Sequence, residues 1–382
     1  MRYPETKLPK VGTTIFTEMS QLANATGAIN LSQGFPDFDA PAGLRERVAH
    51  YINSGANQYA PMTGVPALRE AIALKCERLY GHKPCMDTEV TVTSGATEAL
   101  FAAISAVVRR DDEVILFDPC YDSYEPAIEL NGGRAVHLAL DEQDFSIDWN
   151  RLADAISPRT RMIVINTPHN PTGSVLSADD LQRLAALVRD TDILLIGDEV
   201  YEHIVFDGGA HQSLLCHAEL ARRSFVVSSF GKTYHATGWK IGYCIAPAPL
   251  SAEFRKVHQY LTFSTMTPAQ LGLADFINAA PEHYLELPAF YQAKRDLFRD
   301  LMVPSRFALT AAPGTYFQLA DYSAISDLRD TEFAKWLTRE AGVATIPVSV
   351  FCQQPLQRKL VRFCFAKGEE TLREAAARLC KI

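Results

Sequence analysis

Apolar residues recur along the chain in two alternating patterns, one with the period of a helix and one typical of a buried strand. Within residues 66–79, Leu68, Ile72 and Leu79 fall on one helical face, because positions four and seven apart lie on the same side of a helix. Residues 162–165 read Met-Ile-Val-Ile without a polar interruption, which is typical of a strand buried on both faces. The alternation predicts an α/β fold in which helices cover a mostly parallel sheet.

The same patterns divide the chain into two regions. Further helices are predicted over residues 41–51, over about 97–109 and after the N-cap Ser177, and strands over residues 89–93, 114–117, 135–140, 162–166, 193–197, 225–229 and 241–246. From about Pro281 the order becomes helix, strand, helix, two strands, helix. We therefore expect a three-layer sandwich as the large domain, residues 45–285, and a smaller α+β domain made of residues 1–44 and 286–382.

Composition narrows the function classes. Of 382 residues, 37 are Lys or Arg and 45 are Asp or Glu, a net charge of -8, which argues against non-specific binding to nucleic acid. No apolar run approaches the roughly 20 residues that a membrane-spanning helix needs, and no apolar segment of a signal peptide follows the start. The eight cysteines form no C-x-x-C pair. We expect a soluble cytoplasmic protein with reduced thiols.

Unusual polar residues follow the predicted strands, where open α/β sheets bind ligands. Ser94-Gly95-Ala96-Thr97 lies between a strand and a helix and suits an anion, although a plain connecting turn explains it equally well. The two prolines flanking Asn170 either hold that side chain in one orientation or form a structural turn. No metal-ligand set is predicted around this loop. Asp198 ends a buried strand, where it is paired or hydrogen-bonded, or else is solvated at the strand end.

The segment from Ser229 to Lys240 carries the strongest chemical signal. Gly231-Lys232-Thr233 is not a nucleotide P-loop, because Val226 stands where that motif needs glycine. One of its two lysines suits a nucleophile and the other a phosphate partner, unless both are solvated loop residues. Arg362 is the other anomaly, because it interrupts an apolar strand where an unpaired charge is costly. It forms a structural ion pair or binds an anionic ligand.

In chain order, these pieces resemble the class I and II aminotransferases of the fold-type I pyridoxal-phosphate enzymes. The resemblance spans nearly the whole chain, through Leu31-Ser32-Gln33-Gly34-Phe35-Pro36-Asp37, Asn57-Gln58-Tyr59, Asn170-Pro171-Thr172-Gly173, Asp198-Glu199-Val200-Tyr201, Ser229-Phe230-Gly231-Lys232 and Val361-Arg362-Phe363. Within the family, residues 13–59 and 228–270 are most similar to bacterial methionine aminotransferase and to the kynurenine aminotransferase (glutamine transaminase K) group.

The resemblance implies pyridoxal 5′-phosphate as cofactor and a role for each matching residue. Lys232 holds the cofactor as a Schiff base and moves the proton at Cα, while Asp198 pairs with the pyridinium nitrogen. The other expected ring contacts are Asn170 and Tyr201 on O3′ and Tyr121 stacked on the ring face. The expected phosphate contacts are Gly95, Ala96, Thr97, Ser229, Lys240 and, from the neighbouring subunit of a homodimer, Tyr59. Arg362 binds the substrate α-carboxylate beside Gly34 and Asn170.

The resemblance also implies the reaction, transamination between an L-amino acid and a 2-oxo acid. We expect donors with uncharged, apolar or aromatic side chains, such as methionine, the aromatic amino acids, glutamine and kynurenine. No further Arg is offered for a distal carboxylate, and the Ile15-Phe16 segment supplies apolar groups. Two alternatives are a cysteine-conjugate β-lyase that uses the same lysine, and a non-catalytic pyridoxal-phosphate-binding protein. The second is disfavoured because Lys232 is intact and no DNA-binding module is appended.

Overall fold

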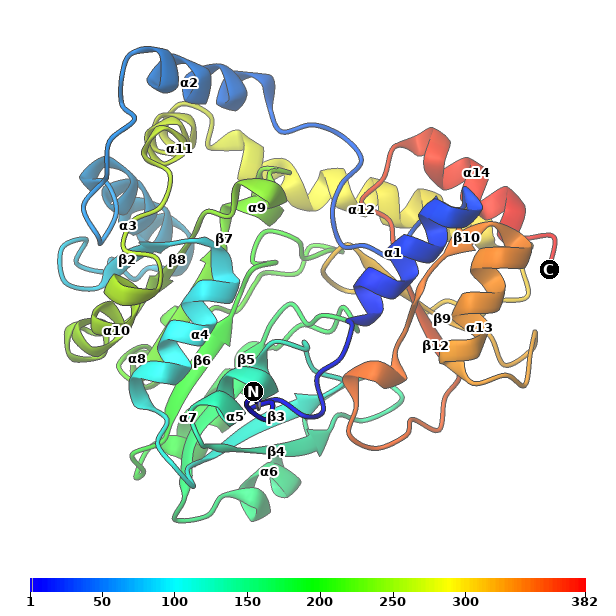
Figure 1. Cartoon of the computed structure of the whole chain (residues 1–382), viewed down its shortest axis with the longest axis horizontal. Helices are drawn as coiled ribbons and strands as arrows, with labels where there is room; N and C mark the ends of the chain where they lie inside the picture. The colour runs from blue at the N-terminus through cyan, green and yellow to red at the C-terminus, as the bar shows by residue number, and fades with distance from the viewer. Residues whose placement is uncertain (2) are drawn as a thin grey trace.

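A seven-stranded sheet forms the centre of the larger part of the computed structural model, which describes Met1 and residues 3–382 (Figure 1). The strands lie in the order β2-β8-β7-β6-β5-β3-β4. Their bounds are β2 (Val90–Thr93), β3 (Glu113–Asp118), β4 (Arg134–Ala139), β5 (Thr160–Asn166), β6 (Leu194–Asp198), β7 (Ser224–Ser229) and β8 (Gly242–Ile245). β8 runs antiparallel to both neighbours and every other pair is parallel. The expected mostly parallel sheet is confirmed.

Helices cover both faces of this sheet, as the uninterrupted apolar strands predict. In β5, Ile163 and Ile165 join one core cluster, whereas Met162 and Val164 join another on the opposite face. The first cluster includes residues of α2 (Ala42–Asn53), α3 (Pro66–Tyr80), α6 (Trp149–Ala155), α7 (Ala178–Val188), α8 (Ala218–Ala221) and α11 (Thr267–Ala279). The second includes residues of α4 (Gly95–Val107), α5 (Tyr124–Leu130) and α10 (Ala248–Leu261). The predicted three-layer sandwich is therefore observed.

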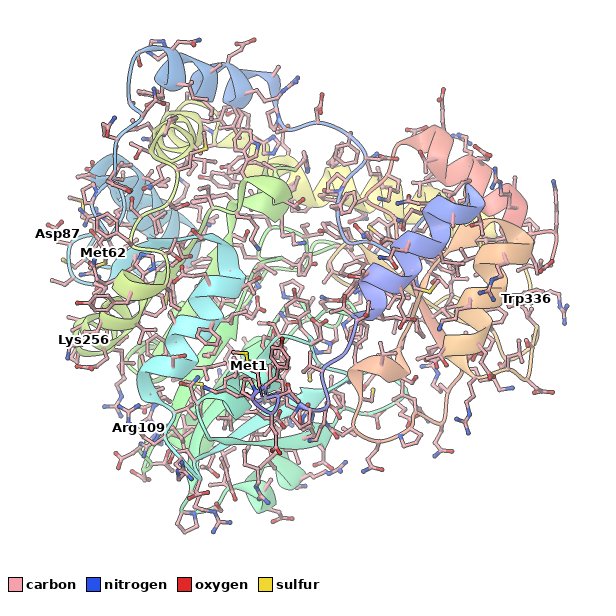
Figure 2. All side chains as sticks on the ribbon, in the orientation of Figure 1. Met1, Met62, Asp87, Arg109, Lys256 and Trp336 are labelled. Carbon is pink, nitrogen blue, oxygen red and sulfur yellow. The ribbon has the colours of Figure 1, made fainter. Side chains whose placement is uncertain are left out.

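A smaller part packs around its own core at the other end of the molecule, where Figure 2 labels Trp336. The connecting helix α12 (Glu282–Met302) runs between the two parts (Figure 1). The smaller part contains α1 (Ile15–Thr26), β1 (Ile29–Asn30), β9 (Phe317–Asp321), α13 (Asp330–Trp336), β10 (Val343–Ala344), β11 (Ile346–Pro347), β12 (Leu360–Cys364) and α14 (Glu369–Leu379). β9, β12 and β11 form an antiparallel sheet, and β1 pairs with β10. The predicted boundary at residue 285 falls in the first turn of α12 and stays a prediction.

Local sequence signals account for the starts of α7 and α3. The Ser177 side chain accepts a hydrogen bond from the Asp180 backbone and Asp180 reciprocates, which is a capping box at the start of α7. Pro66 occupies the first turn of α3, where its missing N–H costs nothing. The central strands lie within two residues of their predicted bounds. None of the helices in the described chain is long and apolar enough to cross a membrane.

Candidate active site

A pocket lies at the carboxyl ends of β5, β6 and β7, where ligand sites of open α/β sheets form. It brings together residues from four separate loops and from the start of α4. Every predicted cofactor contact except Tyr59 lines it: Gly95, Ala96, Thr97, Tyr121, Asn170, Asp198, Tyr201, Ser229, Lys232 and Lys240. The sequence therefore identified the lining of one real pocket.

Lys232 points into this pocket from α9 (Phe230–Thr233), a short helix that directly follows β7 and is capped by the Ser229 side chain. Its Nζ donates a hydrogen bond of 3.0 Å to the Gly34 carbonyl and lies 5.6 Å from the ring centroids of both Tyr201 and Tyr316. Burial lowers the pKa of Lys232 to about 8, because a buried ammonium loses its hydration. The amine is thus available as a nucleophile and base near neutral pH.

Asp198 faces the same space from the end of β6 and is 4% exposed. Its Oδ2 accepts a hydrogen bond of 2.6 Å from the Tyr124 hydroxyl. Burial raises the pKa of this carboxyl to about 6, although the Tyr124 hydrogen bond acts in the opposite direction. A cationic ligand atom beside Asp198 would relieve the cost of burying its charge. Tyr124 escaped prediction, because its role rests on a single hydroxyl contact that leaves no pattern in the sequence.

Groups that attract anions line the same pocket. The first residues of α4, Gly95, Ala96 and Thr97, line it together with Ser229 and Lys240. A Cβ built on Gly95 would lie only 3.3 Å from Lys240 Nζ, and Gly95 has φ +76°, so a larger residue would crowd this approach. Free N–H groups, a hydroxyl and an ammonium together suit a phosphate group.

Arg362 lies on β12 with 1% exposure, so its charge is buried. The guanidinium donates to Asn170 Oδ1 at 2.7 Å and to the Ser32 carbonyl at 3.1 Å, while its buried Nε has no partner. No carboxylate forms a salt bridge with it within the described chain. Its hydrogen-bonding capacity is therefore incompletely used, which fits a site for an incoming carboxylate rather than a structural ion pair.

Aromatic rings surround this guanidinium. Arg362 Cζ lies 3.8 Å from the centroid of Phe317, 5.5 Å from that of Phe16 and 5.8 Å from that of Phe351. Phe16, predicted from the sequence, therefore lies beside Arg362, whereas Phe317 and Phe351 were not predicted. Their apolar strand and turn contexts resemble ordinary core, so sequence pattern alone could not single them out.

Gly34 lies between Lys232 and the Phe317 ring beside Arg362. Its carbonyl accepts hydrogen bonds from Lys232 Nζ and from the Tyr316 hydroxyl at 2.5 Å. A Cβ at this position would lie 2.7 Å from the Phe317 ring, so only glycine fits without displacement. Tyr201 is buried edge-on to Tyr316, with ring centroids 5.1 Å apart, and burial raises the pKa of its phenol.

Tyr59 is the one predicted cofactor contact that lies elsewhere. It is 82% exposed and packs edge-on against Phe263, with the ring centroids 5.2 Å apart. Tyr260, from the same segment as Phe263, is 89% exposed. Within one chain these residues lie on the surface and do not line the cofactor pocket.

Comparisons with known proteins agree with this geometry. The family model described as "Aminotransferase class I and II" matches residues 26–379. Methionine aminotransferase of Escherichia coli (strain K12) is 59% identical over 99% of this chain and 98% of its own, and a structure titled as identifying a methionine aminotransferase function in E. coli superposes with a TM-score of 0.98, at 58% identity over the whole of both chains. Kynurenine–oxoglutarate transaminase 1 of Mus musculus is 34% identical over 96% of this chain and 94% of its own.

The pocket fits the cofactor of this family. The residues Gly95, Ser229 and Lys240, the amine of Lys232 and the buried carboxylate of Asp198, which forms no salt bridge within the described chain, fit the phosphate, the aldehyde and the ring nitrogen of pyridoxal 5′-phosphate. Arg362 leaves donors for a substrate carboxylate beside them. With the family model covering most of its length, this chain belongs to the class I and II aminotransferases of fold type I, which use pyridoxal 5′-phosphate.

Proposed function

We propose that this aminotransferase moves the amino group of methionine, and of aromatic amino acids, glutamine and kynurenine, to a 2-oxo acid. The observation that carries the proposal is the buried Arg362, which lacks a carboxylate partner and lies among Phe16, Phe317 and Phe351. A single guanidinium in an aromatic setting suits one α-carboxylate next to an apolar side chain. The names of the E. coli and mouse relatives support these donors.

Each pocket residue has a proposed part in the reaction. When bound, the cofactor supplies the electron sink that lets the Cα–H bond of the amino acid break. Lys232 Nζ would take the proton from Cα of the amino acid and would return it to the carbon of the cofactor that carried the amino nitrogen; its pKa, lowered to about 8, makes the free amine accessible close to neutral pH. Asp198 holds a proton on the ring nitrogen, and Tyr124 positions Asp198 through its 2.6 Å hydrogen bond.

The remaining residues bind and orient. Gly95, Ala96, Thr97, Ser229 and Lys240 would hold the phosphate, and Tyr121 would stack on the ring face. Asn170 and Tyr201 would donate to the ring oxygen. Asn170 also accepts from Arg362 at 2.7 Å, so one amide would link the cofactor contact to the carboxylate contact. This sharing fixes which face of the amino acid meets Lys232.

We also propose a homodimer in which Tyr59 of each subunit reaches the phosphate site of the other. The support is the exposed pair Tyr59 and Phe263, which pack against each other, together with the exposed Tyr260 on the helix before Phe263, because exposed apolar groups mark interfaces. Mixing Lys232→Ala with Tyr59→Ala tests it. If sites are shared, exchange of subunits creates some intact sites and restores activity to two defective preparations. No recovery after demonstrated subunit exchange would contradict shared sites.

Two further proposals concern organisation and location. We propose that residues 1–44 and 286–382 act as one unit against residues 45–285, because Leu31 shares a core cluster with residues of α12 and α14. We propose a cytoplasmic location, because all eight cysteines are free in the structure.

The decisive experiment compares kcat/KM for methionine, phenylalanine, kynurenine, glutamine and aspartate with one common 2-oxo acid. Differences among the apolar donors should be modest, since one methylene contributes only about 1–3 kcal/mol in such pockets. Aspartate should be the poorest donor, because its second carboxylate would be buried without a cation. Aspartate as best donor would overturn the proposal. With a cysteine conjugate, release of ammonia and pyruvate in place of a new amino acid would identify a β-lyase instead.

A further inference from the structure

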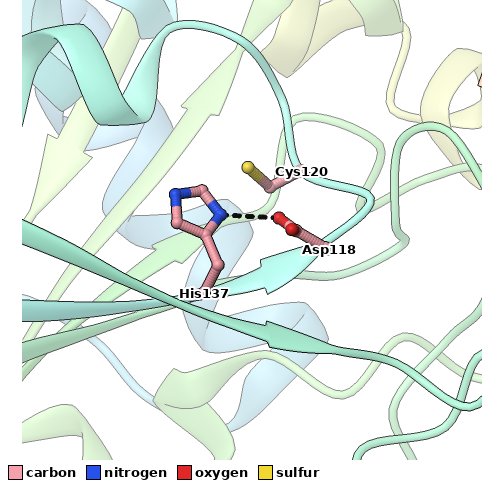
Figure 3. Close-up of side chains that lie close together, drawn as sticks. All are labelled: Asp118, Cys120 and His137. Atoms are coloured by element: carbon pink, nitrogen blue, oxygen red, sulfur yellow. Dashed lines mark hydrogen bonds and ion pairs between the residues drawn. The ribbon is translucent and has the colours of Figure 1, made fainter. Parts of the chain in front are cut away.

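Three potential metal ligands converge outside the cofactor pocket, where β3 ends beside β4 (Figure 3). Asp118 is the last residue of β3, Cys120 follows two positions later, and His137 lies on the parallel strand β4. One ligand atom from each residue lies within 4.8 Å of the other two. Asp118 and Cys120 are close in sequence, but His137 lies further along the chain, and this spacing matches no metal-binding motif. Strand pairing alone brings His137 to the other two.

We propose that Asp118, Cys120 and His137 bind one Zn²⁺ ion. Thiolate, imidazole and carboxylate are the ligands that Zn²⁺ takes in proteins, at about 2.0–2.3 Å each. Ligand atoms of a tetrahedral ion are therefore roughly 3–4 Å apart. The three ligand atoms here lie within 4.8 Å of one another, and His137 Nδ1 and Asp118 Oδ1, which are 2.7 Å apart, would separate to admit the ion. Asp118 and Cys120 are buried and His137 is partly buried, so their backbones are already held in place by the sheet.

The two ring nitrogens of His137 fit this assignment. Nδ1 lies 2.7 Å from Asp118 Oδ1, and the dashed line in Figure 3 joins these atoms. Nε2 is buried without a hydrogen-bond partner, at 3.8 Å from Glu125 Oε2. If Zn²⁺ binds Nδ1, the ring proton moves to Nε2 and is directed at Glu125. A carboxylate that accepts from the second nitrogen is the usual outer partner of a metal-bound histidine.

Residues around the three ligands provide negative charge, and a cleft gives Zn²⁺ access from solvent. Cys120, Glu125 and His137 line a cleft beneath the N-terminal segment, together with Cys352. Glu125 and Glu129 on α5 face the same cleft; the exposed Lys10 forms salt bridges with both, and Gln353 Nε2 donates to Glu125. The cleft gives Zn²⁺ an entry path and room for water, or for Cys352, as a fourth ligand. Zn²⁺ displaces the proton of the Cys120 thiol as the Zn–S bond forms, so one proton leaves to solvent.

The proposed Zn²⁺ site also adjoins the cofactor pocket and the surroundings of Arg362. Tyr121 follows Cys120 directly and lines both the cleft and the cofactor pocket. The Cys120 backbone N–H donates to the Phe351 carbonyl at 2.8 Å, and Phe351 lies beside Arg362. Zn²⁺ would therefore fasten a segment that borders the cofactor on one side and the substrate carboxylate site on the other.

Calorimetric titration of the holoenzyme with Zn²⁺ alone tests the proposal. We expect one ion per chain, with about one proton released at binding. Cys120→Ser and His137→Gln should each weaken binding by roughly 100-fold or more, since each removes a direct ligand. Cys85→Ser is the matched control, because Cys85 is an exposed thiol outside the cluster, and it should bind like the parent. Substituting Co²⁺ should give the visible bands of a tetrahedral thiolate site.

Either of two results would contradict the Zn²⁺ proposal. No saturable uptake by the parent enzyme, or unchanged affinity in both variants, would overturn the proposal. Thermal unfolding with and without added metal separates ligation from folding, because the rise in unfolding temperature on adding Zn²⁺ reports metal binding alone and should disappear in a ligand variant whatever its stability without metal. If Cys120→Ser is unstable, His137→Gln alone decides the outcome.

Discussion

Two buried lysine–carboxylate clusters lie close together in the large part of the molecule, and they are built differently. In the cofactor pocket, Lys232 donates to a carbonyl, Asp198 accepts from the Tyr124 hydroxyl and, at 3.4 Å, from the Val200 backbone N–H, and Lys232 and Asp198 form no salt bridge. In the other cluster, Lys75 on α3 lies 2.7 Å from Glu202 and also contacts Tyr243 at 2.6 Å. Lys75 is buried and Lys232 is partly buried, so both amines are largely removed from water.

The satisfaction of hydrogen bonds separates the two clusters. Glu202 accepts from Lys75, Tyr80, Ser228 and Tyr243. Burial alone would raise the pKa of Glu202, but Lys75, His203 and the hydrogen bonds hold it well below its usual range. In the pocket, burial dominates, which raises the pKa of Asp198 to about 6 and lowers that of Lys232 to about 8. A cluster complete within the chain stabilises the fold, and an incomplete one is available to ligands.

Lys232→Ala gives the largest expected effect. Turnover should fall by roughly 10⁴-fold, because no other amine can move the Cα proton. Borohydride should also no longer attach the cofactor to the chain, as peptide mass spectrometry would show. The exposed Lys256 supplies the control, since Lys256→Ala should leave rate and labelling unchanged. Normal turnover in Lys232→Ala, or label on another lysine, would refute its assignment.

Asp198→Asn should cost about 10³-fold in kcat with the cofactor still bound. The amide cannot hold a proton on the ring nitrogen by its charge, and preorganised charges of this kind contribute most of an active site's rate. Absorbance of the purified variant checks that the cofactor is present. Near-normal turnover with the cofactor fully bound would show that Asp198 has another role.

Lys75→Met probes the complete cluster and should act on stability instead. Leaving Glu202 buried without its ammonium should lower the free energy of unfolding by about 3–5 kcal/mol, measured by urea titration of the cofactor-free protein. The double variant Lys75→Met/Glu202→Gln should recover part of this loss, because no unpaired charge remains. A large fall in kcat of the folded, loaded Lys75→Met enzyme would break the distinction between the clusters.

The two clusters also show where sequence reasoning stops. Lys232, Asp198 and Arg362 were predictable because each is a charge next to an apolar strand, and because the ordered motifs resemble one family. Lys75 and Glu202 are 127 positions apart, and Lys75 lies in an ordinary amphipathic helix. Their pairing depends on how α3 packs against the turn after β6. The sheet was predictable from apolar strands, but the reversal of β8 was not, since a strand buried on both faces reads alike in either direction.

Tyr59 shows a second limit of what the structure of one chain can test. Its predicted contact crosses to another subunit, and one chain places it on the surface. Tyr124 and Tyr316 were missed for the opposite reason. Each orients a partner through a single hydroxyl, Tyr124 on Asp198 and Tyr316 on Gly34, whereas buried tyrosines are common in cores. Such supporting contacts follow from three-dimensional packing and leave no spacing pattern in the sequence.

Arg362→Lys should weaken binding of both the amino acid and the 2-oxo acid by roughly 10–100-fold. A point charge replaces the planar fork, and hydrogen bonds to charged groups contribute about 1.5–3 kcal/mol. Steady-state KM values for both substrates provide the measurement. Arg295 is a matched control, since it is also buried but already paired with Asp207 at 2.6 Å, so Arg295→Lys should leave both KM values near the parent's. Unchanged KM values in Arg362→Lys would show that Arg362 has a structural role and does not bind the substrate carboxylate.

The smallest expected effect is the pH dependence of cofactor attachment to the cofactor-free enzyme. Burial lowers the pKa of Lys232 from 10.5 to about 8, so the amine is protonated below about pH 8 and free above it. The attachment rate should rise roughly tenfold between about pH 7 and 9 and then level off, because the unprotonated fraction saturates one unit above the pKa. An unperturbed lysine would instead continue to gain through about pH 10. Stopped-flow absorbance follows the rate, and borohydride trapping confirms that Lys232, and not the hydrogen-bonded Lys75, is labelled at each pH. A rate still rising steeply at about pH 10 would mean that burial does not set this amine apart.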